Sequence, residues 1–200
     1  MDMLVADLEG VFLPEIWINV ALKTGIEELK LTTRDISDYN VLMTRRLALL
    51  KEHNLRIQDI QSVIATLEPL PGAREALDWI RSRSQIIILS DTFEEFAKPL
   101  MPGLGFPTLL CHSLTIDNQG NITDYNLRID NQKQKAVQAF KSLHYQVTAF
   151  GDSYNDIDMI QAAHQGFFFK PPASVITDFP DIPVTRNYDE LKAMIASLLH

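Results

Sequence analysis

The stretch GDSYND at residues 151–156 follows a short apolar run, Val147–Phe150, that is typical of a buried strand. A second apolar run, Met3–Leu8, ends in DLEG at residues 7–10. Both predicted strands therefore end in carboxylate side chains. In an open parallel sheet, ligands bind at the carboxyl ends of the strands. The two stretches together predict an acidic site at one edge of a parallel sheet.

Outward from these two strands, strand-like runs alternate with helical patterns along most of the chain. Further strands are predicted at 85–90, 108–111 and 166–169, and helices at 73–83, 93–101, 132–144, 153–164 and 188–199. This alternation predicts the α/β class with a doubly wound, mostly parallel sheet. Residues 113–128 alternate in hydrophobicity around NQG at 118–120, which predicts a β-hairpin. The hairpin could form a second lid or extend the sheet.

The region between the first two strands departs from this alternation. Helical patterns occupy 14–25, 39–53 and 56–67, and the segment PLPG at 69–72 then breaks the pattern. We therefore expect a small helical cap inserted after the first strand. The predicted division is a cap subdomain at 14–69 and an α/β core domain made of 1–13 and 70–200.

Composition narrows the class of protein. The 200 residues include 26 acidic and 18 basic side chains, for a net charge of −8, and 46 % are hydrophobic. This balance is typical of a globular chain, and its acidity argues against nucleic-acid and anionic-membrane partners. The single cysteine, Cys111, excludes an intrachain disulfide. With no export signal recognisable at the N-terminus, we expect a cytoplasmic location.

Several strand ends contribute acidic or hydroxyl side chains. Any one of them could simply cap a helix. That explanation weakens when Asp7, Glu9, Asp91 and Asp152 are expected at the same sheet edge, because carboxylates packed together repel one another unless a cation offsets them. A site of carboxylates, phosphate and water suits Mg²⁺, so the sequence predicts a magnesium site.

Four segments in this order resemble the motifs of the haloacid dehalogenase-like phosphohydrolases. They are DLEGV at 7–11, ILS at 88–90, Lys133 and GDSYND at 151–156. Within that superfamily the chain is most similar to the phosphoserine phosphatases, including members that also transfer the phosphoryl group to homoserine. Two of these motifs depart from the usual pattern: Glu9 replaces an aspartate in the first, and SDT at 90–92 replaces Ser-Gly-Gly in the second.

The resemblance implies a Mg²⁺-dependent phosphoserine phosphatase that works through an aspartyl-phosphate, with homoserine as a second small-molecule acceptor. The implied catalytic residues are Asp7 as nucleophile, Glu9 as general acid and base, Ser90 and Lys133. The implied metal ligands are Asp7, Asp152 and the backbone carbonyl of Glu9. Asp156 is implied to orient Lys133 and the water ligands of the metal without binding phosphorus. The implied substrate-binding residues are Glu15 for the amino group, Arg46 for the carboxylate, and Ser90, Asp91, Lys133 and Asn155.

Other functions remain open at this stage. The chain could be a phosphatase of another small phosphomonoester. A phospho-accepting receiver-like domain also has an acidic Mg²⁺ pocket, but it has no acid two residues after its phosphorylated aspartate and no helical insertion. A carbon–halogen hydrolase on the same fold would have no use for Asp152. We expect small-molecule substrates, no nucleic acid, no membrane, and a monomer or homodimer.

Overall fold

The computed structural model describes residues 1–32, 35–36 and 38–199, and its centre is a seven-stranded sheet. The strand order is β4-β3-β2-β1-β5-β6-β7, and only β4 runs antiparallel to its neighbour. The strands are β1 (Asp2–Ala6), β2 (Gln85–Phe93), β3 (Thr108–Ile116), β4 (Ile122–Asn126), β5 (Gln146–Gly151), β6 (Gln165–Phe169) and β7 (Val184–Thr185). The prediction of an α/β fold with a mostly parallel sheet is confirmed.

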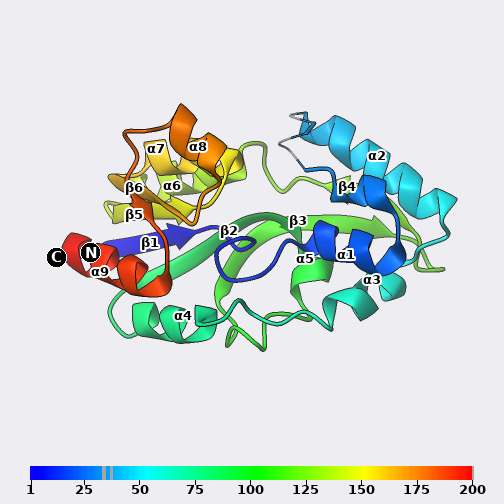
Figure 1. Cartoon of the computed structure of the whole chain (residues 1–200), viewed down its shortest axis with the longest axis horizontal. Coiled ribbons are helices and arrows are strands. Elements are labelled where there is room, and N and C mark those ends of the chain that lie inside the picture. Colours follow the sequence, from blue (N-terminus) through cyan, green and yellow to red (C-terminus); the bar gives the residue numbers. More distant parts are fainter. Residues whose placement is uncertain (33–34, 37, 200) are drawn as a thin grey trace.

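Helices cover both faces of the sheet (Figure 1). One face carries α4 (Ala73–Arg81) and α9 (Tyr188–Leu198), and the other carries α6 (Gln132–Ser142), α7 (Ile157–Ala162) and α8 (Ala173–Asp178). The burial of α4 illustrates why: its buried residues Ala73, Ala76, Leu77 and Ile80 recur at the spacing of one helical face. The sheet therefore lies between two layers of helices, and its polar strand ends remain available for a site.

The segment between β1 and α4 is helical, as predicted. It contains α1 (Ile16–Thr24), the 3-10 helix η1 (Glu27–Lys30), α2 (Tyr39–Glu52) and α3 (Ile57–Ile64). Helices α1, α2 and α3 gather at the end of the sheet toward which β1 points (Figure 1). The predicted cap at 14–69 also includes residues 33–34 and 37, which lie outside the described residues. The exact division into cap and core stays a prediction.

The predicted hairpin extends the sheet. Strands β3 and β4 pair antiparallel from Ser113 opposite Asn126 to Ile116 opposite Ile122. The hairpin also contacts the helical segment, because the main-chain N–H of Ile57 donates to the carbonyl of Gly120 at 2.9 Å. The extended sheet thus supports the helices that stand over its strand ends.

Most predicted elements differ from the structure by a few residues at their ends, and three differ more substantially. Strand β2 continues through Phe93 because β3 pairs with it there, so the helix predicted at 93–101 shrinks to α5 (Glu94–Ala97). The helix predicted at 153–164 is divided into the 3-10 helix η2 (Tyr154–Asp156) and α7. The strand predicted at 108–111 continues into the hairpin as β3. Among the described residues, no helix is both long and apolar enough to cross a membrane.

Candidate active site

Asp7 stands at the carboxyl end of β1, at the start of a tightly folded loop. Its main-chain N–H donates to the carbonyl of Phe150 on β5 at 3.1 Å, and its side chain is almost fully buried. A hydrogen bond within the loop, from the main-chain N–H of Gly10 to the carbonyl of Leu13 at 2.8 Å, keeps it compact. Tyr188 of α9 donates its hydroxyl to the carbonyl of Val11 at 2.6 Å. The loop is therefore held from both the sheet and α9, which fixes the position of the Asp7 carboxylate.

Gly10 in this loop allows Asp152 to approach. Its φ is +76°, in the left-handed region that glycine adopts readily. A Cβ atom at this position would also lie 2.4 Å from Oδ2 of Asp152, which follows β5. A side chain at this position would require the Asp152 carboxylate to move. The glycine of the DLEG stretch therefore brings two acidic strand ends together.

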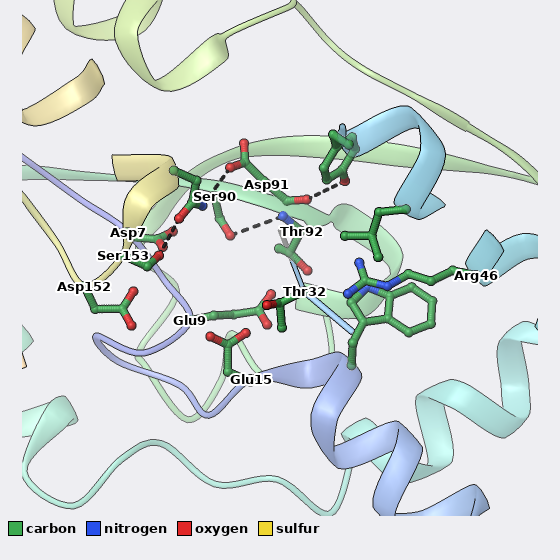
Figure 2. A pocket seen from close by; sticks show the side chains of 14 residues that line it. Asp7, Glu9, Glu15, Thr32, Arg46, Ser90, Asp91, Thr92, Asp152 and Ser153 are labelled. Atoms are coloured by element: carbon green, nitrogen blue, oxygen red, sulfur yellow. Dashed lines mark hydrogen bonds between the residues drawn. The ribbon is translucent and has the colours of Figure 1, made fainter. Parts of the chain in front are cut away.

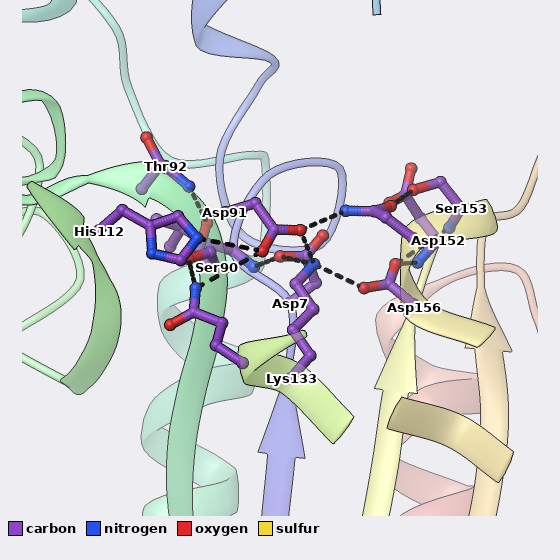
Figure 3. Close-up of polar contacts among 12 residues, drawn as sticks. Asp7, Ser90, Asp91, Thr92, His112, Lys133, Asp152, Ser153 and Asp156 are labelled. Atoms are coloured by element: carbon purple, nitrogen blue, oxygen red, sulfur yellow. Dashed lines mark hydrogen bonds and ion pairs between the residues drawn. The ribbon is translucent and has the colours of Figure 1, made fainter. Parts of the chain in front are cut away.

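Lys133, in the first turn of α6, lies beneath the carboxylates. Its Nζ is 3.0 Å from Oδ1 of Asp7 and 2.8 Å from Oδ1 of Asp156, and it is 3.4 Å from Oδ2 of Asp91 (Figure 3). Burial alone would lower the pKa of Lys133, but Asp156, Asp7 and Asp91 raise it well above its usual range. The lysine is therefore a fixed positive charge in contact with the predicted nucleophile.

Asp156 is fully buried, and both of its oxygens are engaged. Oδ1 accepts from Lys133, and Oδ2 accepts from the main-chain N–H groups of Asp152 and Ser153 at 3.0 and 3.1 Å. These contacts orient the lysine and the start of the GDSYND turn. They agree with the supporting role predicted for Asp156, since its lone pairs are already shared with protein donors.

Asp7, Asp152 and Asp156 form a buried cluster that fits a divalent metal ion. One oxygen from each lies within 4.8 Å of the others. Burial and then the charge of Asp156 raise the pKa of Asp7 well above its usual range, so the one ammonium of Lys133 does not balance these carboxylates. Hard carboxylate oxygens are the ligands that Mg²⁺ and similar cations prefer. The ligand set, including the backbone carbonyl of Glu9, stays a prediction.

Ser90 and Asp91 lie near the carboxyl end of β2, beside Asp7 (Figure 3). Ser90 is almost fully buried, and its carbonyl accepts from the side-chain amide of Gln132. Burial alone would raise the pKa of Asp91, but Lys133, with hydrogen bonds from His112 and Asn155, holds it well below its usual range. The Asp91 side chain is therefore an anion next to the predicted phosphate-binding groups.

The opposite wall of the cleft comes from the helical segment. Arg46 of α2 is buried, and its guanidinium carbon lies 4.5 Å from the centroid of the Trp17 ring on α1 (Figure 2). Burial lowers the pKa of Arg46 to about 10, so the group stays charged at neutral pH. Glu15, just before α1, lines the same cleft.

Glu9 lies between the two walls. Its Oε2 accepts from the main-chain N–H of Ile16 at 2.8 Å. Burial, followed by the nearby charge of Glu15, raises its pKa to about 7. A carboxyl group with a pKa near neutrality can both give and take a proton, which is what a general acid and base requires.

The structure brings every predicted site residue to one place. A single cleft is lined by Asp7, Glu9, Glu15, Arg46, Ser90, Asp91, Asp152 and Asn155. Lys133 and Asp156 lie beneath it, in contact with Asp7 or with each other. The individual roles stay predictions.

Sequence reasoning missed several residues of this region, among them Trp17, Tyr39, His112 and Gln132. Trp17 is a core residue, as expected, but it also lines the cleft beside Arg46. The other three contact Asp91 or the carbonyl of Ser90. Nothing in their local sequence distinguishes them from structural residues.

The chain also matches a known family over most of its length. Residues 6–164 match the sequence model of the haloacid dehalogenase-like hydrolases. The match covers more than half of the chain and contains the core carboxylates, Ser90 and Lys133. The chain therefore belongs to the haloacid dehalogenase-like hydrolase family and is an enzyme of that class. This finding decides against the receiver-like alternative.

Two relatives within this family are more than half identical to this chain, and both are phosphoserine phosphatases. The chain is 56 % identical over 192 residues to phosphoserine phosphatase ThrH of Pseudomonas aeruginosa, covering 96 % of this chain and 94 % of that protein. It is 54 % identical to a phosphoserine phosphatase of Pseudomonas syringae pv. tomato, over 96 % and 81 % of the two chains. The predicted resemblance to phosphoserine phosphatases is confirmed.

A solved structure shares the fold. It is a phospho-aspartyl intermediate analogue of phosphoserine phosphatase, with a TM-score of 0.78 and 20 % identity over 100 % of this chain and 99 % of that one.

Proposed function

We propose that this enzyme hydrolyses O-phospho-L-serine to L-serine and phosphate. The observation that carries the proposal is the pairing of two sites in one cleft. At one end the Asp7 carboxylate lies 3.0 Å from Lys133, and at the other the buried Arg46 faces the same space with Glu15. The first end suits a phosphoryl group and the second suits an amino acid. The similarity to two phosphoserine phosphatases supports the assignment.

The proposed reaction has two displacements at phosphorus. An oxygen of Asp7 forms a bond to phosphorus while the bond from phosphorus to the serine oxygen breaks, and Glu9 gives its proton to that oxygen. Water then attacks the acyl-phosphate, Glu9 takes the water proton, and phosphate leaves as Asp7 is restored. Lys133 and the Ser90 hydroxyl hold the phosphoryl oxygens in both steps.

The metal ion that we propose is Mg²⁺. Asp7, Asp152 and the backbone carbonyl of Glu9 would hold it, and when bound it supplies positive charge that offsets the phosphoryl oxygens and the carboxylates. Asp156 acts through its contacts with Lys133 and with the main chain at Asp152.

Arg46 and Glu15 define the substrate in this proposal. A guanidinium suits the α-carboxylate of phosphoserine, and a carboxylate suits its ammonium. Arg46 already has a hydrogen bond from Nη2 to the carbonyl of Leu31 at 2.9 Å, which holds the side chain in the cleft. Another small phosphomonoester that lacks these two charges would use only the phosphate end.

The same cleft supports a second proposed activity, phosphoryl transfer to homoserine. Homoserine carries the same two charged groups as serine and is one methylene longer. A site distinguishes one methylene by only about 1–3 kcal/mol, so both amino acids can reach the same phosphoryl group. We further propose a cytoplasmic enzyme that acts on small molecules as a monomer or homodimer.

Phosphate release from O-phospho-L-serine, measured with Mg²⁺ and after chelation by EDTA, tests the proposal. We expect turnover that disappears with EDTA and returns with added Mg²⁺. With homoserine present, phosphohomoserine should form at the expense of free phosphate. Absence of metal-dependent phosphate release would contradict the proposed function, and absence of phosphohomoserine alone would contradict the transfer activity.

A further inference from the structure

The carboxylate of Asp91 attracts donors from several elements. Its Oδ2 accepts from the side-chain amide of Asn155 at 3.0 Å and lies 3.4 Å from Nζ of Lys133. Its Oδ1 lies 3.5 Å from the amide nitrogen of Gln132 and 3.7 Å from Nε2 of His112 (Figure 3). The charged oxygens of Asp91 are therefore surrounded by donors from α6, β3 and the GDSYND turn.

One of these donors, Lys133, is assigned to phosphate by the proposed function, and a second, Asn155, is implied in substrate binding by the family resemblance. Lys133 and Asn155 can give the same hydrogen bonds to a phosphoryl oxygen that they give to Asp91. The Asp91 side chain is about one-third exposed and lines the cleft with Asp7 and Ser90. A phosphate in this cleft would meet a like charge at short range, which is unfavourable in a partly buried site.

His112 offers the carboxylate another partner. The main-chain N–H of Arg128 donates to Nδ1 of His112 at 3.2 Å, so in the neutral imidazole the proton is on Nε2. Nε2 is the atom that faces Asp91. His112 is almost fully buried, and its ring packs near Phe93 and Tyr39, which keeps the donor in place.

We propose that Asp91 is an internal anion that competes with phosphate for Lys133 and Asn155 and turns toward His112 when phosphate binds. The inference rests on the proposed function and deepens it. In the resting enzyme Asp91 keeps the two donors ordered. After the second displacement, the same charge favours departure of the phosphate product and limits inhibition by it.

Binding of inorganic phosphate in the presence of Mg²⁺, measured by calorimetry, tests this competition. The variants are Asp91→Asn, which keeps the shape and removes the charge, and Asp130→Asn as a control. Asp130 is an exposed acid in a neighbouring cavity, and its replacement changes the net charge equally. We expect Asp91→Asn to lower the phosphate dissociation constant at least about tenfold and Asp130→Asn to change it less than about twofold.

A third variant tests the partner. His112→Asn removes the alternative donor, so phosphate binding should weaken by about threefold or more. Thermal unfolding of each variant checks that it is folded. Unchanged or weaker phosphate binding by folded Asp91→Asn, while wild type turns over phosphoserine, would overturn the inference alone. Absence of phosphate binding in every protein would contradict the proposed function and the inference with it. Unchanged phosphate binding by folded His112→Asn would contradict the proposal that Asp91 turns toward His112.

Discussion

The two ends of the cleft are built differently. At the phosphate end, Lys133 contacts three carboxylates, and both oxygens of Asp156 are hydrogen-bonded. At the amino-acid end, Arg46 is stacked on Trp17 and its Nε is buried with no hydrogen-bond partner among the described residues. The first arrangement fixes groups for chemistry that every phosphate ester needs. The second keeps a charged donor available for one kind of substrate, so chemistry and specificity should be separable by mutation.

Loss of the proposed nucleophile should have the largest effect. Asp7→Asn keeps the shape of the side chain but removes the attacking charge, so kcat for phosphoserine should fall by roughly 10⁴-fold or more. Phosphate release under saturating substrate measures the effect. A variant that retained a tenth of the activity would show that Asp7 is not the nucleophile.

Changes at the amino-acid end should affect phosphoserine far more than a phosphate ester that lacks the amino-acid groups. Arg46→Ala should lower kcat/KM for phosphoserine by about 10²-fold, because the substrate carboxylate loses a buried partner, but should change kcat/KM for an aryl phosphate only a few-fold. The neighbouring Arg45→Ala is the matched control, since Arg45 is exposed on the same helix. Equal losses on both substrates would remove Arg46 from the specificity role.

Gly10→Ala should disturb the acidic cluster without replacing any of the proposed metal ligands. The added Cβ would push on the Asp152 carboxylate, and we expect about tenfold weaker Mg²⁺ binding in a calorimetric titration. Gly25→Ala is the control: its φ is +74° with nothing within 4 Å of the added Cβ. Both variants should lose about 1 kcal/mol of unfolding free energy from backbone strain. Unchanged Mg²⁺ affinity in Gly10→Ala would contradict the close approach.

The smallest expected effect comes from removing a hydrogen bond between helix α2, which carries Arg46, and the strand end that carries Asp91. The Tyr39 hydroxyl on α2 donates to the carbonyl of Asp91 at 3.0 Å. Tyr39→Phe should lower the unfolding free energy by about 1 kcal/mol and change kcat/KM only a few-fold. Tyr125→Phe removes a more exposed hydroxyl, which donates to Asn40 at 2.6 Å, and should cost less because water replaces that bond. Denaturant unfolding measures both variants, and a larger loss of unfolding free energy in Tyr125→Phe than in Tyr39→Phe would contradict this expectation.

The sequence predicted the parts of the molecule in which local pattern and chemistry agree. β1 and β5 are apolar runs followed at once by acids, so the strands, their parallel arrangement and the meeting of Asp7 with Asp152 could be inferred together. Glu15 and Arg46 carried no such local signal. They were assigned only because the motifs around them resembled a known family, and the structure does bring them to the same cleft.

What the sequence could not predict depends on pairing between distant segments. β2 continues through Phe93 because His112 of β3 pairs with it, and this pairing overrides the helical pattern predicted from residue 93 onward. The same pairing aims His112 at Asp91, while α6 brings Gln132 to the carbonyl of Ser90. No spacing rule connects these residues, so the surroundings of Asp91 emerged only from the fold.

The proposed reaction requires that the phosphoryl group pass through Asp7. Acid quenching of the enzyme during turnover of phosphoserine, followed by peptide mass spectrometry, tests it directly. We expect an acid-stable, base-labile phosphoryl group on the peptide that contains Asp7, and we expect it to be absent in Asp7→Asn. A phosphoryl group on Ser90 or another residue, or full turnover with no phosphorylated peptide in repeated rapid quenches, would contradict it.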